Sequence, residues 1–365
     1  MIKKNLLFIN DWMYGGGAER SMAILVNELA KSKEYNIKLL MLENKNSYEL
    51  DNSIEILYFR DSYKFGIIGK LFTLSLDPFR LNNIIKSNSI DTVISFQHRS
   101  NFINIFTKYL NNNYKSIISE RVYTKDYFGN NKLSDNFFNF MIKWLYKKAD
   151  QITCNAQDIK KGLIEFYNTD NTPIKVIENS YDVDKILELS KEDIDLENKH
   201  IFDSGKKIII NIGRLSEQKG QKYLLEAFSK IEKKDDYIVV ILGEGYLREN
   251  LENLAEDLKI TKYIFFLGQK ENPYKYLKNS DIFVFPSLYE GYPNALAEAM
   301  VFDLSIISFD FKSGARDLIG DNEYGALVNM YDTLTLSKSI INSKKRKKII
   351  LNTIKDLIDD YTKLL

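Results

Sequence analysis

The sequence predicts an α/β protein built from two doubly wound domains, each with a parallel sheet between layers of helices. Short, continuous apolar runs recur along the chain, as is typical of strands that are buried on both faces of a sheet. Amphipathic helical stretches alternate with these runs. The length of 365 residues suffices for two domains of ordinary size, each with its own core.

The first half begins this alternation at its N-terminus. An apolar run at residues 4–10 is followed by a helical stretch from about Ala18 to Lys31. Further apolar runs predict strands at 35–42, 53–59, 91–97, 115–120 and 150–156. Residues 1–180 are therefore predicted to form an N-terminal Rossmann-like domain. Residues 181–203 are polar and charge-rich with weak periodicity, which indicates a hinge or linker.

The second half shows the pattern more clearly. Strands are predicted at residues 206–213, 237–243, 263–268, 281–287 and 304–310. Between them, residues 221–231 place Leu224, Leu225 and Phe228 on one helical face, and leucines recur from Leu247 to Leu258. Residues 204–343 are predicted to form a C-terminal Rossmann-like domain. The tail, 344–365, is predicted to be a helix that packs back on the first domain.

The composition of the chain argues against several classes of function. A net charge of +1 gives no basic field for nucleic acid. The single cysteine, Cys154, excludes an intramolecular disulfide and favours a reducing compartment, and with only two histidines a Cys/His zinc site is excluded. No apolar run approaches the ~20 residues that span a bilayer, and the N-terminal run is too short for a signal peptide. A cytoplasmic protein is expected.

One candidate site is the stretch SLYEGYPNALAEAM, which follows a predicted strand and holds Glu290 and Glu298. Pro293 suits the first turn of a helix, so Glu290 falls in the loop and Glu298 in the helix. Free amides at residues 294–296 would point toward that loop and favour an anion. Carboxylates beside them accept hydrogen bonds from hydroxyls. The alternative is an ordinary turn with two solvated acids, and spacing alone leaves both open.

A second candidate is the loop NIGRLSEQKG, which follows the first strand of the second half. Arg214 and Lys219 are cations at the same end of the sheet as Glu290. Two cations there can hold a diphosphate and stabilise its negative charge as it leaves. The alternative is a surface loop with an ion pair to Glu217.

A third candidate is DWMYGGGAERS, where Gly15 to Gly17 follow a strand and open a helix, the usual setting of a phosphate-binding loop. It is not the G-x-G-x-x-G fingerprint, because Arg20 stands where the third glycine belongs, and no Gly-Lys-Ser/Thr follows. The stretch LGEGYLR fails in the same way at Arg248. NAD binding is therefore not expected.

Together, GGGAER, NIGRLSEQKG, ILGEGYLRENLENLAEDL, SLYEGYPNALAEAM and DFKSGARDLIGDNEYGALV resemble the retaining glycosyltransferases of family 4. The likeness is dense from about Lys206 to Val328, and in the first half only the glycine loop is specific. Overall, the sequence is most similar to those of bacterial enzymes that extend undecaprenyl-diphosphate-linked oligosaccharides or build surface polysaccharides. The N-acetylgalactosamine transferases of N-glycan assembly are one example. The resemblance implies the GT-B fold, in which two Rossmann-like domains face each other across a cleft.

The resemblance also implies residue roles. Glu290 would contact donor-sugar hydroxyls, and Arg214 and Lys219 would grip the donor diphosphate, which makes these three the catalytic candidates. Glu298 would bind the ribose, and Gln269 would pair with the base. The remaining donor-binding positions are Gly16, Gly17, Gly291, Tyr292, Pro293, Asn294, Ala295 and Leu296. The donor would be a nucleotide sugar, UDP-linked, and no metal or other cofactor is required if the cations carry the leaving charge.

The first domain would bind the acceptor, and one departure from the family lies there. Many relatives have a histidine directly after SE, where this chain has Arg121. His98 could compensate, although a lone histidine is more often structural. Arg20, His98 and Arg121 are the acceptor-side candidates. The implied acceptor is a glycan or a polyprenyl-diphosphate-linked glycan.

A lipid-linked acceptor would require contact with an anionic membrane, on the inner face of the cytoplasmic membrane. Residues 63–79 and 137–150 mix apolar and aromatic residues with flanking lysines, as do helices that lie on a headgroup layer. The run Lys344 to Lys348 would add attraction to anionic lipid. The alternative, equally open, is that the first two are packed helices and the third is a solvated face.

The sequence is less consistent with three other functions. A GT-B-fold nucleotide-sugar epimerase would need an acid/base set in the first domain, and none is evident. A non-catalytic sugar-nucleotide-binding protein would be expected to lack an acid or cation of the donor site, whereas Glu290, Glu298, Arg214 and Lys219 are all present. A metal-dependent transferase is disfavoured, because the Asp-x-Asp spacings at 182–184 and 193–195 fall in the predicted hinge.

Overall fold

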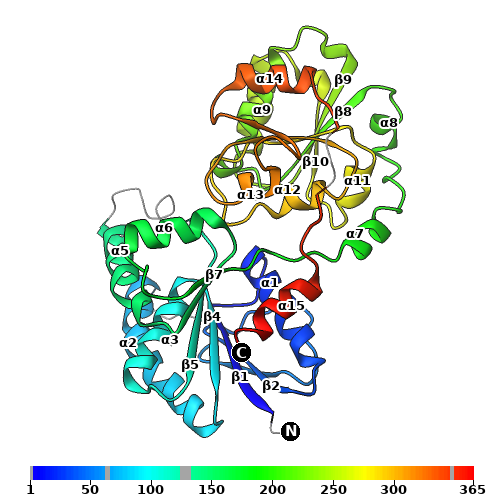
Figure 1. Cartoon of the computed structure of the whole chain (residues 1–365). Coiled ribbons are helices and arrows are strands. Elements are labelled where there is room, and N and C mark those ends of the chain that lie inside the picture. The colour runs from blue at the N-terminus through cyan, green and yellow to red at the C-terminus, as the bar shows by residue number, and fades with distance from the viewer. Residues whose placement is uncertain (1–2, 62–65, 124–132, 346–348) are drawn as a thin grey trace. The chain divides into compact units, whose positions relative to one another are not determined.

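The computed structural model describes residues 3–61, 66–123, 133–345 and 349–365, with the side chains of 66–74 and 133–134 left out of the description. The chain forms two compact units (Figure 1). The first unit comprises residues 1–180 and 354–365, and the second unit comprises residues 181–353. The chain therefore leaves the first unit once and returns to it at its C-terminal end.

The first unit contains a parallel sheet with the strand order β3-β2-β1-β4-β5-β6-β7. Its strands are β1 (Lys4–Asn10), β2 (Tyr35–Met41), β3 (Glu55–Tyr58), β4 (Thr92–Phe96), β5 (Lys115–Glu120), β6 (Gln151–Cys154) and β7 (Ile174–Val176). The strand order reverses between β1 and β4. Consecutive strands build outward from β1 in one direction and from β4 in the other.

Both faces of this sheet are buried. Leu6 and Phe8 of β1 belong to one apolar cluster, and Leu7 and Ile9 belong to another. Burial on both sides explains why this strand is a continuous apolar run rather than an alternating one. The described helices of this unit are α1 (Gly17–Ala30), α2 (Gly66–Ser87), α3 (His98–Leu110), α5 (Leu133–Leu145), α6 (Gln157–Tyr167) and α15 (Ile354–Thr362), with a 3₁₀ turn η1 (Tyr146–Lys148).

The last helix, α15, lies beside α1 in the first unit (Figure 1). Its side chains Leu357 and Tyr361 are buried in the apolar cluster on that face of the sheet. The helix predicted over 344–365 begins only at Ile354, because the preceding residue pairs with Tyr181 in an isolated parallel bridge.

The second unit contains a parallel sheet with the order β10-β9-β8-β11-β12-β13. Its strands are β8 (Lys207–Ile212), β9 (Tyr237–Leu242), β10 (Ile264–Gly268), β11 (Ile282–Phe285), β12 (Ser305–Phe309) and β13 (Ala326–Val328). Here the order reverses between β8 and β11. This repeats the arrangement of the first unit.

Helices and 3₁₀ turns connect these strands. The helices are α7 (Val183–Leu189), α8 (Lys199–Phe202), α9 (Gln221–Ser229), α10 (Arg248–Asp257), α11 (Tyr274–Lys278), α12 (Asn294–Ala299), α13 (Ala315–Ile319) and α14 (Thr333–Ile341). The 3₁₀ turns are η2 (Glu217–Lys219), η3 (Lys234–Asp236) and η4 (Thr261–Tyr263). The region 181–203, predicted as a hinge, contains α7 and α8, and α7 packs against α11 of the second unit.

The prediction of two doubly wound α/β units is confirmed. Every apolar run that was predicted to be a strand is one, within about two residues at each end. Strands β7 and β13 were not predicted; they have three residues each and are only partly buried at most positions. So short a run carries too little periodicity to indicate a strand.

Among the described residues, no helix combines the length and the hydrophobicity that crossing a bilayer requires. Two segments that were predicted to contact a membrane lie partly outside the described residues. Residues 63–65 and 346–348 are not described, nor are the side chains up to residue 74. Of the segment 137–150, the part within α5 packs on α3.

Candidate functional site

The strand order of the second unit creates a crevice at one end of its sheet. The crossovers from β8 and from β11 run in opposite directions, so the chain continues from these two neighbouring strands to opposite faces of the sheet. Open α/β sheets bind ligands at this switch point. The loop after β8 carries Arg214 and Lys219, and the loop after β11 carries Glu290. The topology thus brings two of the predicted motifs together.

Lys219 and Glu290 form the central contact of this crevice. The distance from Lys219 Nζ to Glu290 Oε1 is 2.6 Å, and the side chains are 20% and 8% exposed. Gln218 Nε2 donates to Glu290 Oε2 at 3.3 Å and to the backbone oxygen of Tyr289 at 2.9 Å. Lys219 Nζ also lies 5.3 Å from the ring centroid of Phe285. The carboxylate is therefore held by one cation and one amide.

Gly220 lets these two loops approach each other. Its φ is +62°, and a Cβ at this position would lie 2.1 Å from the backbone oxygen of Pro286. A side chain there would be strained by the backbone angle and would also clash with the neighbouring loop. The glycine directly after Lys219 is thus a structural requirement of the site.

Glu298 lies in α12 and has a different partner. Tyr274 Oη donates to Glu298 Oε1 at 3.3 Å, and both side chains are buried. Asn294, at the start of the same helix, accepts a hydrogen bond on Oδ1 from Tyr181 Oη at 2.7 Å. The partners described for Glu290 are Lys219 and Gln218, whereas the partner described for Glu298 is Tyr274. The two carboxylates of the predicted motif therefore occupy separate hydrogen-bonding environments.

The prediction of three free amides at the start of α12 is wrong for two of them. The N–H of Asn294 donates to the oxygen of Tyr292 at 2.9 Å, and the N–H of Leu296 donates to the oxygen of Pro293 at 3.0 Å. The cause is Pro293, whose φ of −84° and ψ of 72° make an inverse γ-turn that closes on the helix start. With two amides engaged, the cations of the β8 loop carry more of any anion binding.

Arg214 and Gln269 are exposed at the same end of the sheet. Arg214 follows β8, and the predicted alternative of an ion pair with Glu217 does not occur among the described residues. Gln269 follows β10, two strands from β8 in the sheet. Adjacent strands lie about 4.8 Å apart, so β8 and β10 are separated by roughly 10 Å. This is comparable to the reach of a nucleotide from its phosphates to its base.

The structure adds residues to this site that the sequence reasoning missed. Ser313 Oγ donates to the backbone oxygen of Gly291 at 2.5 Å. Ser313 and Gly314 both have positive φ, 77° and 96°, and a Cβ at Gly314 would lie 2.5 Å from Cδ of Pro293. The loop after β12 therefore supports the Glu290 loop. Its motif, DFKSGA, had been noted for the resemblance but had no assigned role.

The first unit has its own switch point between β1 and β4, and the glycine loop lies there. A Cβ at Gly16 would be 1.9 Å from Glu19 Oε2, so the Glu19 carboxyl packs directly against this loop. Gln97, which has a φ of 70° at the end of β4, donates to Glu19 Oε1. Burial raises the pKa of Glu19. A carboxyl in this place is better suited to hydroxyl groups than to a phosphate.

His98 belongs to a buried polar cluster beside that loop. Its Nδ1 lies 3.1 Å from Glu120 Oε2, and Tyr146 Oη donates to the same carboxylate oxygen at 2.8 Å. Burial, and next the Glu120 charge, raise the pKa of Tyr146. Arg121 is buried, with Nη2 donating to Asn179 at 2.5 Å and its guanidinium 4.7 Å from the ring centroid of Phe96. Of the acceptor-side candidates, Arg20 is exposed and His98 partly exposed.

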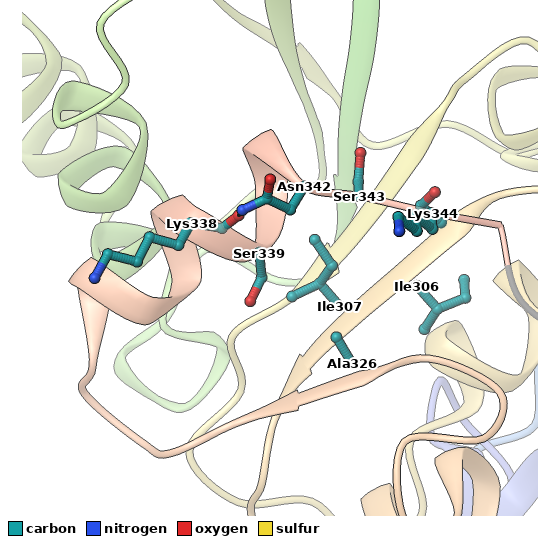
Figure 2. Close-up of a pocket in the computed structure, with 9 residues that line it drawn as sticks. Ile306, Ile307, Ala326, Lys338, Ser339, Asn342, Ser343 and Lys344 are labelled. Atoms are coloured by element: carbon teal, nitrogen blue, oxygen red, sulfur yellow. The ribbon is translucent and has the colours of Figure 1, made fainter.

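A separate pocket of about 230 Å³ lies between α14 and the strands β12 and β13. Figure 2 shows Ser339 on α14 and Asn342 just after it near Ile307 and Ala326, with Lys338 extending away from the strands. The pocket also includes Ser305, the first residue of β12, so it lies toward the amino ends of the strands. Ligand sites of parallel sheets lie at the carboxyl ends. This pocket is therefore not the candidate donor site.

The site of the second unit combines the chemistry needed to hold a polar anionic ligand. It offers a partly buried cation, an exposed arginine and two buried carboxylates that can accept hydrogen bonds from hydroxyl groups. Among the described residues, no group of three or more histidine, cysteine, aspartate or glutamate side chains is arranged to hold a metal ion. Charge stabilisation and positioning are the effects that these side chains can supply.

Two family models match this chain, one in each half. The model described as Glycosyltransferase Family 4 matches residues 15–185, and the model described as Glycosyl transferases group 1 matches residues 192–356. The first match falls mainly in the first unit and the second mainly in the second unit.

Similar proteins of known name come from Campylobacter jejuni. N-acetylgalactosamine-N,N'-diacetylbacillosaminyl-diphospho-undecaprenol 4-alpha-N-acetylgalactosaminyltransferase is 29% identical over 353 residues, which cover 96% of this chain and 93% of that protein. GalNAc-alpha-(1->4)-GalNAc-alpha-(1->3)-diNAcBac-PP-undecaprenol alpha-1,4-N-acetyl-D-galactosaminyltransferase is 26% identical over 363 residues, which cover 97% and 93%. Among solved structures, HepE of Anabaena in complex with UDP superposes with a TM-score of 0.76 at 13% identity, covering 100% of this chain and 99% of HepE. That likeness concerns the fold.

Proposed function

This chain belongs to the glycosyltransferases with the two-domain GT-B fold, in which a family 4 domain precedes a group 1 domain, and from that premise we propose its donor, acceptor and mechanism. It transfers a hexose or N-acetylhexosamine from a UDP-sugar to a glycan on a polyprenyl diphosphate, with retention of the anomeric configuration. The second unit binds the donor, and the first unit binds the acceptor.

The observation that carries the proposal is the Lys219–Glu290 contact at the switch point of the second sheet. Lys219 and Arg214 hold the donor diphosphate there, one as a partly buried cation and the other as an exposed arginine. When the diphosphate binds, Lys219 exchanges part of its contact with Glu290 for the phosphate oxygens. Glu290 is then free to accept hydrogen bonds from the hydroxyls of the sugar.

The remaining donor contacts follow from the same loops. Glu298, already positioned by the Tyr274 hydroxyl, accepts hydrogen bonds from the ribose. Gln269 pairs with the uracil, since it is exposed two strands away from β8. The backbone of Gly291 to Leu296 and the loop of Gly16 and Gly17 complete the donor site. A UDP donor agrees with the UDP bound by HepE, a protein of the same fold.

The reaction needs charge stabilisation more than proton transfer by a side chain. The bond between the anomeric carbon and the diphosphate oxygen breaks, and the acceptor oxygen bonds to that carbon on the same face. The acceptor proton passes to the departing diphosphate, so no enzyme base or metal is required. Lys219 and Arg214 stabilise the negative charge that develops on the diphosphate.

The acceptor assignment is supported by the two Campylobacter relatives, whose names specify undecaprenol-linked acceptors. In this chain, Arg20, His98 and Arg121 lie in the first unit, and the Glu120 carboxylate orients His98. An isoprenoid diphosphate resides in a membrane, whereas a nucleotide sugar is dissolved in the cytoplasm. The protein therefore works as a peripheral protein on the inner face of the cytoplasmic membrane.

A screen of nucleotide sugars without any acceptor tests the donor half of this proposal. The true donor at about 100 times its Kd should stabilise the fold by ~2.7 kcal/mol. A domain of this size gains roughly 2–4 °C in Tm per kcal/mol, so a shift of roughly 5–11 °C is expected. Glu298→Ala should reduce this shift for UDP-sugars, and Lys338→Ala, in the separate pocket of Figure 2, should not.

The proposal fails if no UDP-sugar raises the Tm, or if Glu298→Ala and Lys338→Ala respond alike. The acceptor half is tested with a short-chain polyprenyl diphosphate that carries one N-acetylhexosamine. Transfer to this acceptor with the α-configuration retained, observed by NMR of the product, is expected. An inverted product would contradict the mechanism while leaving the donor site intact.

A further inference from the structure

Large apolar side chains gather on the outside of the first unit. They come from three helices that are separate in sequence, α2, α3 and α5, and α3 packs against the other two. The exposed ones are Leu76, Phe79, Tyr109, Leu110, Phe137, Phe140 and Trp144. Soluble proteins scatter such residues singly, whereas a contiguous group marks an interaction surface.

Five of these side chains, those of Phe79, Tyr109, Leu110, Phe137 and Trp144, line an apolar groove of about 520 Å³, and Leu76 and Phe140 belong to the same helices. Phe106, Tyr109 and Leu110 of α3 line it together with residues of α2 and α5 on either side. The rings of Tyr109 and Trp144 are stacked, with centroids 5.6 Å apart and planes 12° apart. Phe140 and Trp144 are 63% and 51% exposed, so this packed surface still presents aromatic area to its surroundings. We call it the α2/α3/α5 groove.

The exposed charges on and just after α5, beside the α2/α3/α5 groove, are basic. Lys143, Lys147 and Lys148 are exposed on and just after α5, and Lys148 Nζ lies 5.7 Å from the ring centroid of Tyr109. The described acidic side chains nearby in the sequence do not offset this charge. Asp77 and Asp135 are buried, and Asp150 pairs with Lys108 at 2.7 Å. The groove is thus an apolar centre with a basic border.

We propose that the α2/α3/α5 groove docks the protein on an anionic lipid bilayer, with lipid acyl chains covering the groove and lysines contacting headgroup phosphates. Proteins that contact membranes concentrate tryptophan, tyrosine and lysine next to apolar side chains at the boundary between lipid headgroups and acyl chains. A second copy of this chain fits poorly, because a two-fold contact would bring the lysines of both copies together. The inference rests on the proposed function, since it supplies the membrane contact that the lipid-linked acceptor requires.

The test is flotation of the purified full-length protein with vesicles that contain no isoprenoid acceptor. Wild-type protein should float with phosphatidylcholine vesicles that contain 30% phosphatidylglycerol, and much less with phosphatidylcholine alone. Phe140→Ser/Trp144→Ser should abolish flotation. Leu196→Ser, at a residue that is exposed in the second unit, should not. Because each basic residue near an anionic surface adds about a fivefold factor, Lys143→Gln/Lys147→Gln/Lys148→Gln should weaken partitioning about 100-fold.

The matched control is Lys3→Gln/Lys33→Gln/Lys161→Gln, which removes the same charge from exposed positions elsewhere in the first unit. Equal partitioning of the two triple variants would overturn the proposal, as would undiminished flotation of Phe140→Ser/Trp144→Ser. Flotation that requires a polyprenyl diphosphate would overturn it in favour of the acceptor's chain as occupant. A dimer in analytical ultracentrifugation that the serine variant dissociates would overturn it in favour of a second copy.

Failure of the docking surface and failure of the proposed function can be told apart. Phe140 and Trp144 are not placed in the reaction, so Phe140→Ser/Trp144→Ser should keep the wild-type rate on a water-soluble, short-chain acceptor. It should lose activity on the same glycan carried by a long-chain lipid in vesicles. Loss on both acceptors would show that the groove does not act as a membrane contact. Flotation of a wild-type protein that uses no UDP-sugar would leave the groove valid and reject the proposed function.

Discussion

Replacing Lys219 with methionine separates the structural and catalytic contributions of the Lys219–Glu290 pair. Methionine keeps the apolar stem that lies beside Gly213, but it removes the ammonium, which is 2.6 Å from Glu290 Oε1 and 5.3 Å from the ring centroid of Phe285. In the described structure, Glu290 would keep one side-chain partner, the Gln218 amide at 3.3 Å. Glu290 is 8% exposed, so water can replace little of the lost contact.

Two magnitudes follow from this geometry. Leaving a buried polar group with a missing partner costs roughly 1–3 kcal/mol. For a unit of this size, that lowers the Tm by roughly 2–12 °C. If Lys219 also stabilises the departing diphosphate, its loss removes one preorganised charged donor, which lowers kcat by about 10²–10³. The two effects appear in different measurements.

The double variant Lys219→Met/Glu290→Gln distinguishes them. A neutral glutamine needs no cation, so the Tm should recover most of the loss, measured by scanning fluorimetry. The transfer rate, measured as UDP release under single-turnover conditions, should not recover, because both proposed contacts to the donor are still missing. If the rate returned together with the Tm, or if Lys219→Met alone kept a near-wild-type kcat, the pair would be structural only.

Three further outcomes are expected. Gly220→Ala should lower the Tm well beyond Gly205→Ala, because both glycines have positive φ but only Gly220 has a backbone oxygen 2.1 Å from the added Cβ; equal losses would contradict the close approach of the loops. Hydrogen bonds from Lys275 and Tyr276, followed by Lys270, lower the pKa of Asp195 below its ordinary 3.8. The stability that this carboxylate contributes is therefore present above about pH 4 and lost as the pH falls further. Urea midpoints of wild type and Asp195→Asn should differ at pH 7 and converge in acid, and a constant gap would refute the assignment. Burial raises the pKa of Cys154 to about 12, so dithionitrobenzoate at pH 8 should label this thiol only after unfolding; rapid labelling of the folded protein would show that the thiol is accessible.

The strands could be predicted because a strand that is buried on both faces is a continuous apolar run in the sequence. Each strand pairs with neighbours that are themselves apolar runs, as with Ile209 of β8 beside Ile282 of β11. The glycine-rich and acidic loops were recognisable for a related reason, since each directly follows such a run. The positions of Lys219 and Glu290 at one crevice follow once the strand order is that of a doubly wound sheet.

The rest of the site depends on contacts between distant residues, which leave no local pattern. Tyr274 reaches Glu298 across 24 positions, and Ser313 reaches Gly291 across 22. The engaged amides at the start of α12 were missed for a different reason. Proline was assigned to the first helical turn, whereas Pro293 precedes the helix and forms its own turn. The α2/α3/α5 groove was not predicted. Residues 63–79 and 137–150 were predicted separately to contact a membrane, and the packing of α3 against both α2 and α5 is a contact between distant residues.

Because α15 returns to the first unit, the second unit is an insertion within the sequence of the first unit. Tyr181 and Thr353, at the two ends of the second unit, pair in a parallel bridge. Their neighbours Ser180 and Ile354 are therefore offset by one strand spacing and two residues along the chain, roughly 8 Å in all. Excision of residues 181–353 and a short glycine linker across the gap would leave the first unit with its full core. Truncation after Ser180 would instead strip Leu357 and Tyr361 from that core, so fragments of this enzyme should be cut by topology rather than by sequence order.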